Sequence, residues 1–166
     1  MNRRLLLLTI LGLSVALACD RTPPLTNGLG SADELAGAVL DALARNDRAR
    51  LEQLALSEQE FRDHVWPDLP ASRPERNLPF SYVWGDLHQK SLLSLSTVLG
   101  EHGGKRYQLK RVSFGGEESR YGRARVRREA VFHVMDPSGN EIELRVCGSL
   151  VEHDGVWKVF SYVFRD

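Results

Sequence analysis

The sequence has no excess of charge of either sign. Among its 166 residues, 22 are Lys or Arg and 22 are Asp or Glu, so the formal net charge is zero. Proteins that attract nucleic acid or acidic membranes through their overall charge carry a clear surplus of basic residues. The balance excludes such a global attraction, so any charged binding surface on this protein must be local.

The sequence also lacks clustered metal ligands. It contains only two cysteines, Cys19 and Cys147, and its five histidines are scattered without any i, i+4 pair. Zinc and similar metals are held by His and Cys residues at short, preset spacings. We therefore expect no metal site, and no motif indicates another cofactor.

Long apolar runs are missing apart from one near the N-terminus. The run from Leu5 to Leu17 is 13 residues long, whereas a helix needs about 20 apolar residues to cross a bilayer comfortably. Arg3 and Arg4 precede it, and small residues follow it up to Cys19. A basic start, a short apolar stretch and small residues are typical of an export signal peptide.

The end of this segment, Val15-Ala16-Leu17-Ala18-Cys19, resembles the lipobox of bacterial lipoproteins. The resemblance implies that residues 1–18 are removed and that the thiol of Cys19 carries diacylglycerol, which anchors the domain to a membrane of the cell envelope. An ordinary secretory signal is the alternative. Asp20 resembles an inner-membrane retention signal of enteric bacteria, but inner and outer membrane both stay open. With Cys19 lipidated, Cys147 has no disulfide partner, and we expect it to be a buried packing residue.

Residues 19–30 are rich in Pro, Gly and Asn, which disfavour regular structure. We expect them to form a flexible tether between the lipid and a single folded domain over residues 31–166.

The first half of this domain has the periodicity of helices. Two Ser residues are each followed three positions later by Glu, the pattern of a capping box: Ser31 with Glu34, and Ser57 with Glu60. Apolar residues at helical spacing follow, and they predict helices over about 31–46, 49–54, 57–66 and 82–101. Residues 67–79 contain four prolines and predict an irregular loop.

The second half alternates between apolar and polar residues, which is typical of half-buried strands. We expect a meander of four antiparallel strands over about 106–114, 124–134, 142–150 and 156–164. Turn residues at 136–140 and 153–155 separate the last three.

The helices-then-strands order and the ending Asp154-Gly155-Val156-Trp157-Lys158-Val159-Phe160-Ser161-Tyr162 resemble the NTF2-like (SnoaL-like, cystatin-like) superfamily. The resemblance implies an α+β fold in which helices fill a curved antiparallel sheet to form a cone. Members include isomerases, dehydratases, polyketide cyclases and many non-catalytic binding modules, so the fold does not choose a function.

Enzymes of this superfamily use a carboxylate or a His-Asp pair inside the cone. Here Asp86 and His88 are two residues apart on a predicted helix and so face different sides; we expect His88 to point toward the core and Asp86 to lie near Lys90. We therefore prefer a non-catalytic domain that binds a small ligand or an envelope protein. The alternative is a small enzyme of isomerase or hydrolase type that uses His88 or a carboxylate.

Arginines dominate the segment that follows residue 105. Arg123, Arg125 and Arg127 share one strand face. They form either a docking surface for an anionic partner or a solvated face paired with acids such as Glu141 and Glu143. Few aromatic residues lie among these bases, so we expect no nucleic acid partner. Like charges would meet across a two-fold axis at this face, which argues against a homodimer there, although a dimer through another surface stays open.

Arg128 differs because it alternates with Val126 and Ala130 on the apolar face. A buried arginine needs a partner. Arg128 therefore either reaches water at the mouth of the cone, pairs with an acid or binds an anionic ligand. The residues that we expect to line a ligand cavity with it are Trp84, His88 and Tyr107.

Overall fold

The computed structural model describes residues 22–163. Helices come first and antiparallel strands follow, so the expected α+β class is confirmed. The longer helices are α1 (Ala32–Ala44), α2 (Arg48–Leu54), α3 (Glu58–His64) and α4 (Phe80–His102). Between α3 and α4 lie three short 3-10 helices, namely η1 (Trp66–Asp68), η2 (Pro70–Ser72) and η3 (Pro74–Arg76).

The helices begin close to the predicted caps. At α3 the capping box is complete, because Ser57 accepts a hydrogen bond from the Glu60 amide and the Glu60 carboxylate accepts one from the Ser57 amide. At α1 only half of it forms: Ser31 accepts from the Glu34 amide, but the Glu34 carboxylate accepts from the amide of Gly30. Each 3-10 helix has a proline in its first turn, where a missing N–H costs no helical hydrogen bond.

The expected meander of four strands is wrong. The described residues form two antiparallel sheets, one in the order β1-β4-β5 and the other in the order β2-β3-β6-β7. The strands are β1 (Gln108–Phe114), β2 (Glu118–Tyr121), β3 (Ala124–Arg128), β4 (Ala130–Met135), β5 (Glu141–Leu144), β6 (Cys147–His153) and β7 (Val156–Tyr162).

Two of the long predicted strands break in the middle, and this divides the sheet. Glu129 has a φ of 53°, which interrupts the extended backbone between β3 and β4. The next predicted strand is also interrupted, between Leu144 and Cys147. The amide of Glu129 still donates to the carbonyl of Gly148 across the break, at 2.8 Å. The two sheets therefore stay joined at a bend.

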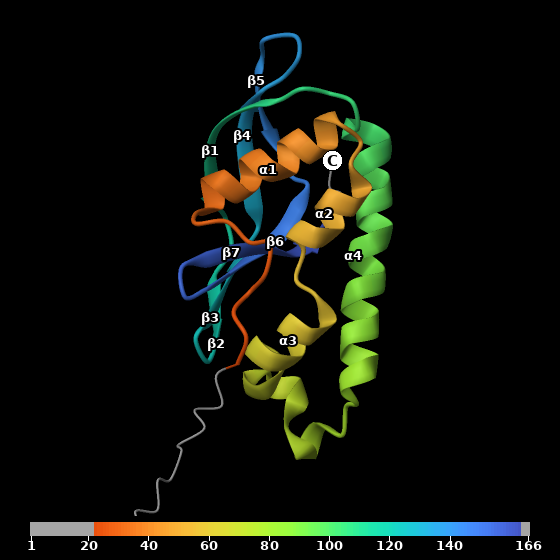
Figure 1. Ribbon diagram of the computed structural model, residues 1–166, viewed down its shortest axis with the longest axis vertical. Coiled ribbons are helices and arrows are strands. Elements are labelled where there is room, and N and C mark those ends of the chain that lie inside the picture. Colours follow the sequence, from red (N-terminus) through yellow and green to blue (C-terminus); the bar gives the residue numbers. More distant parts are fainter. Residues whose placement is uncertain (1–21, 164–166) are drawn as a thin grey trace, which may run out of the picture.

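The helices lie on one side of these sheets (Figure 1). α1 crosses in front of β1 and β4, α2 and α3 follow below it, and α4 stands along one edge over nearly the full height of the molecule. The main core forms between α1, α2, the C-terminal half of α4 and strands β4, β6 and β7. Cys147 is buried in this core, and burial raises the pKa of its thiol.

A second core cluster lies lower, between α3, the start of α4 and the β2–β3 hairpin. Its centre is the buried ring of Phe61, whose centroid lies 5.3 Å from that of Trp84 and 6.2 Å from that of Phe160. Tilted aromatic pairs at such distances contribute beyond their buried area. This cluster holds the N-terminal half of α4 against the rest of the domain.

The last residues of the expected tether belong to the folded domain. Leu25 is buried, and the Thr26 amide donates to the Glu60 carboxylate at 2.7 Å. Leu29 exchanges two backbone hydrogen bonds with Trp157 of β7. Residues 25–30 therefore pack on α3 and β7, and the folded part begins earlier than residue 31.

Candidate functional site

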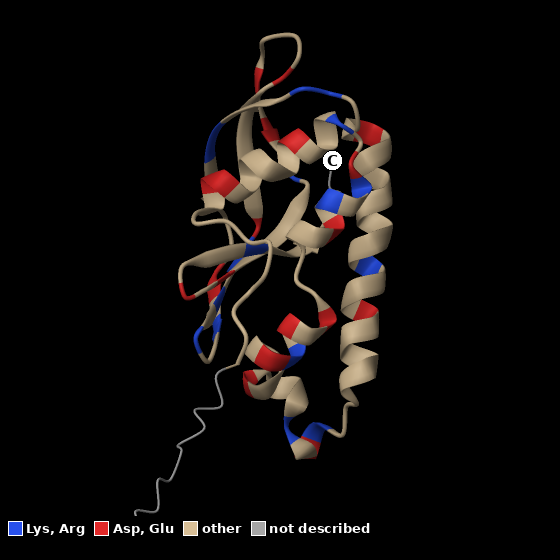
Figure 2. Cartoon of the chain, viewed as in Figure 1, with Lys and Arg blue, Asp and Glu red and all other residues tan. Residues whose placement is uncertain are grey.

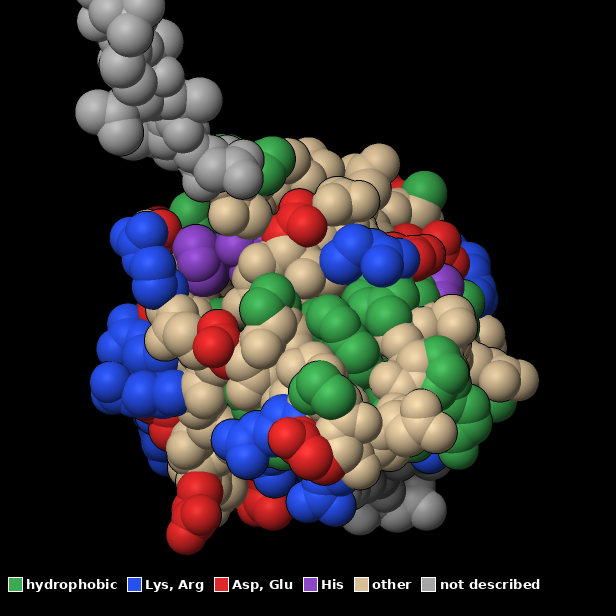
Figure 3. Space-filling model, turned by 90° about the horizontal axis from the view of Figure 1, so that it is seen from below, with side chains coloured by type: hydrophobic (Ala, Val, Ile, Leu, Met, Phe, Trp, Pro, Cys, Tyr) green, Lys and Arg blue, Asp and Glu red, His purple; other side chains and the backbone are tan. Residues whose placement is uncertain are grey.

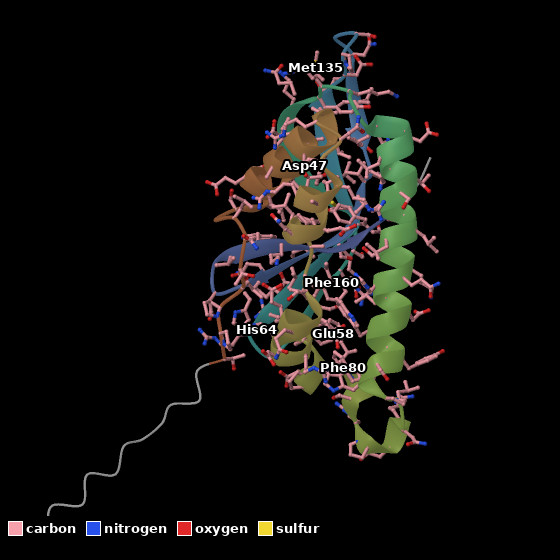
Figure 4. All side chains as sticks on the ribbon, turned by 45° about the vertical axis from the view of Figure 1, so that its right-hand side comes forward. Asp47, Glu58, His64, Phe80, Met135 and Phe160 are labelled. Carbon is pink, nitrogen blue, oxygen red and sulfur yellow. The ribbon has the colours of Figure 1, made fainter. Side chains whose placement is uncertain are left out.

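A pocket of about 350 Å³ opens between α4, the connection from α2 to α3, and β7. Figure 4 shows Glu58 and Phe160 on the side of α3 and β7 that faces α4, and hydrophobic side chains gather on the lower face of the molecule in Figure 3. The pocket walls are mainly apolar and consist of Ala55, Leu56, Trp84, Leu87, Leu92, Leu95 and Phe160.

The buried polar groups of the pocket are already paired. The Ser91 hydroxyl accepts a hydrogen bond from the Tyr162 amide at 3.0 Å, and the Tyr162 hydroxyl donates to the Leu51 carbonyl at 2.7 Å. Burial raises the pKa of Tyr162, so its hydroxyl stays protonated. These bonds fasten α4 to β7 and β7 to α2. The pocket surface that remains available to a ligand is therefore mainly apolar.

The rim of the pocket carries Glu52, Glu58 and His88. Each acid pairs with an arginine one helical turn away, at 2.8 Å for Glu52 and 2.9 Å for Glu58. The His88 ring stacks on Trp84 with centroids 5.1 Å apart and makes no ion pair with an acid among residues 22–163. A general acid–base pair needs hydrogen-bond reach, and these groups do not provide it in this arrangement.

From the sequence we expected Trp84 and His88 to line one cavity with Tyr107 and Arg128. In the structure only Trp84 and His88 lie in the same pocket. His88 is exposed at the rim and does not point into the core. Tyr107 lies elsewhere, with its hydroxyl 2.9 Å from Nδ1 of His102, beside a shallow hollow next to α1. Arg128 is exposed and borders a neighbouring hollow.

Asp86 lies where the sequence suggested, because its carboxylate pairs with Lys90 at 2.8 Å on the exposed face of α4. It therefore points away from the stacked rings of Trp84 and His88. Asp86 and His88 do not form one site.

The arginine face of β3 is paired with acids, though not with the acids we expected. Arg123 pairs with Asp154, Arg125 pairs with Glu152 at 2.6 Å, and Arg127 lies 3.8 Å from Glu118. Figure 2 shows basic and acidic positions side by side in the lower strands of the sheets. Glu143, which we expected opposite them, pairs with Arg145 in the other sheet region. Most of the positive charge on this face is therefore compensated.

Sequence reasoning missed a buried ion pair below the pocket. Lys158 of β7 is only 2 % exposed and Glu60 of α3 only 6 %, and Nζ donates to Oε2 at 2.8 Å. Burial by itself would raise the pKa of Glu60, but hydrogen bonds from Lys158, Ser57 and Thr26 outweigh it and lower the pKa to about 2. The sequence offered one sign of this pair, namely Lys158, a lysine within a mostly apolar predicted strand.

A pair of histidines lies where the N-terminal segment meets the domain. The rings of His64 and His153 are 4.3 Å apart, and Nε2 of His64 lies 2.8 Å from the carbonyl oxygen of Pro23. Histidine side chains are visible together on this part of the surface in Figure 3. Burial, and next the neighbouring His64, lower the pKa of His153.

No protein-family model, curated protein or solved structure matches the chain significantly. Within residues 22–163, no group of His, Cys, Asp and Glu side chains is arranged to hold a metal ion. In the same range no helix has the length and apolar character needed to cross a membrane. The signal segment and Cys19 lie outside the described residues.

Proposed function

We propose that the protein is a bacterial envelope lipoprotein, anchored through Cys19, whose domain binds a small and largely apolar ligand beside α4 without transforming it. The lipobox-like sequence supports the anchor, and the pocket supports the binding role. The same proposal includes an NTF2-like fold. Support for it comes from the order of the elements, with helices before an antiparallel sheet region, and from the interruptions of the long strands at Glu129 and after Leu144.

The pocket is the observation that carries the binding role. Its volume falls within the range of small-molecule sites, which are concave and mostly apolar. The hydroxyls of Ser91 and Tyr162 both bond to backbone groups, the first to the Tyr162 amide and the second to the Leu51 carbonyl. Because His88 stacks on Trp84 and the acids of the rim pair with arginines, the geometry favours binding over acid–base chemistry.

Two neighbouring leucines of α4 provide a matched test. Leu92 lines the pocket, whereas Leu93 is 64 % exposed and points away from it. We expect Leu92→Trp to fill the pocket and weaken binding of the apolar fluorescent probe N-phenyl-1-naphthylamine at least about tenfold, and Leu93→Trp to leave it unchanged. The measurement is a probe titration of the full chain in phosphatidylcholine vesicles, corrected for vesicles alone.

Circular dichroism of both variants would show whether each keeps the fold. If the two folded variants bind the probe equally well, or if the wild type does not bind it above the vesicle background, the pocket is not a ligand site.

A further inference from the structure

A second hollow, of about 430 Å³, lies beside the apolar pocket. Leu87, Ser91 and Tyr162 border both spaces, so only the contact between α4 and β7 separates them. The lining of the second hollow is different, because it includes Lys90, Arg128 and several serines in place of the leucines and aromatic rings.

The polar groups of this hollow form a row across three strands. Arg128 of β3 is the register partner of Ser149 in β6, and Ser149 is the register partner of Ser161 in β7. Directly opposed residues on adjacent antiparallel strands have Cβ atoms about 5 Å apart. One guanidinium and two hydroxyls are therefore presented side by side, and Ser94 of α4 borders the same space.

Arg128 is the free cation of this row. Arg123, Arg125 and Arg127 each have a carboxylate partner, and Lys90 pairs with Asp86, whereas Arg128 makes no ion pair within residues 22–163. The adjacent Glu129 also borders this hollow, and its carboxylate lies against Gly115 rather than in an ion pair with Arg128. A guanidinium with neighbouring hydroxyl donors is well suited to a carboxylate or phosphate.

From these two adjoining spaces we propose that the ligand is a single-chain anionic amphiphile. Its carboxylate or phosphate binds Arg128, Ser149 and Ser161, and its hydrocarbon chain passes Leu87 and enters the apolar pocket. The hydrogen bond between Ser91 and the Tyr162 amide joins α4 to β7 between the two spaces, and Leu87, one helical turn before Ser91, borders both. This inference rests on the proposed binding function and names the class of ligand.

The test compares ligands that share one chain and differ in the head. In the full chain in phosphatidylcholine vesicles, 12-bromododecanoate should quench the fluorescence of Trp84, which lines the pocket where the end of the chain would lie. Trp84→Phe should abolish that quenching. We expect Arg128→Gln to weaken binding of dodecanoate at least about tenfold, since hydrogen bonds to a charged group are lost, and to leave dodecanol unchanged.

Arg111→Gln is the matched control, because Arg111 is exposed on β1 and borders neither hollow. It should leave both affinities unchanged. Dodecyltrimethylammonium has the same chain and a cationic head, and it should compete poorly with the brominated acid.

The outcomes separate this inference from the proposal on which it rests. One outcome keeps the apolar site and refutes the anionic head. In that outcome the naphthylamine probe binds and Leu92→Trp abolishes its binding, but dodecanoate, dodecanol and the ammonium compound compete equally well. Arg128→Gln then changes none of these affinities. If the probe itself does not bind, the proposed function fails first. Preference for dodecyl phosphate over dodecanoate would indicate a phospholipid-type head, and the reverse would indicate a free fatty acid; either result supports an anionic amphiphile.

Discussion

At the scale of single residues, the Glu60–Lys158 pair is the most consequential feature of the lower half of the domain. Both side chains are almost fully buried, and the Glu60 carboxylate also accepts hydrogen bonds from the amides of Thr26 and Ser57. One carboxylate thus connects β7, the start of α3 and the N-terminal segment. Removing one partner of a buried pair leaves an uncompensated charge.

We therefore expect Lys158→Met to lower the free energy of unfolding by about 3 to 5 kcal/mol. The measurement is urea unfolding at neutral pH. Arg45→Ala is the control, because Arg45 pairs with Asp41 on the exposed face of α1, and such surface pairs contribute about 0 to 1 kcal/mol. Equal losses in the two variants would contradict a structural role for the buried pair.

Residue types alone could not reveal this pair. The Ser57–Glu60 capping box was visible in the sequence and is present. The second role of Glu60, as partner of a lysine 98 positions away, depends on how β7 is placed against α3. Similarly, the arginines of β3 were recognisable as one face, but their partners Glu118, Glu152 and Asp154 depend on strand register.

At the scale of elements, the helices follow from local signals and the sheets do not. Caps and apolar stripes predict α1 to α4 to within a few residues. The break at Glu129 has no such marker, because glutamate is an unusual residue for a positive φ. The only irregularity in the pattern there is Arg128, a charged residue on the apolar face, which we read as a ligand or rim residue and not as a strand end. Consequently the sequence predicts four strands where the structure has shorter strands in two sheets. The pocket lies between α4, the connection from α2 to α3, and β7, and the packing of these distant segments could not be read from local patterns.

The bend offers a prediction of its own. A non-glycine residue at a positive φ costs of the order of 1 kcal/mol, and glycine adopts that conformation without the penalty. We expect Glu129→Gly to keep or raise the free energy of unfolding by up to about 1 kcal/mol, and Glu129→Val to lower it by about 1 to 2 kcal/mol, because a β-branched residue resists this backbone. Urea unfolding of both variants is the measurement. A Glu129→Val variant that is as stable as wild type would show that the backbone is not strained there.

The N-terminal segment should respond to pH through the His64–His153 contact. The pKa of His153 lies below its usual value, so the charged form is disfavoured in the folded state. Neutral His153 therefore contributes to the stability of the folded state above the unfolded-state pKa of about 6.5, and this contribution is lost as the pH falls below that value. Protonation of His153 would place a positive charge against the His64 ring, beside Arg123 and Asp154.

We expect hydrogen exchange at the Leu29 amide, which bonds to Trp157, to accelerate between pH 7 and pH 5 relative to unstructured-peptide rates. The amide of Leu56, which bonds to Val159 at 2.8 Å, serves as an internal reference because it belongs to the connection from α2 to α3 and not to the N-terminal segment. His153→Asn should remove most of the pH dependence. Equal protection of Leu29 at both pH values in the wild type would contradict the coupling.

At the scale of the whole molecule, the packed N-terminal segment changes how the domain would sit relative to a membrane. A flexible tether through residue 30 would allow the domain to move about 35 Å from its anchor. Because Leu25 is already buried in the domain, only six residue steps separate it from Cys19, and these reach about 20 Å when fully extended. A lipidated Cys19 would hold the domain close to the bilayer, near a supply of single-chain amphiphiles.

The anchor itself is tested by mass. We expect the wild-type protein isolated from bacterial membranes to lack residues 1–18 and to carry diacylglycerol on Cys19, and Cys19→Ser to carry no acyl group. Cys147→Ala is the control for loss of a thiol, since Cys147 is buried in the core and should not affect lipidation. An acylated Cys19→Ser protein, or a wild type whose mass shows no lipid, would contradict the anchor. Two acyl chains provide stable membrane binding, so unchanged membrane fractionation of a processed Cys19→Ser protein would contradict the anchor equally.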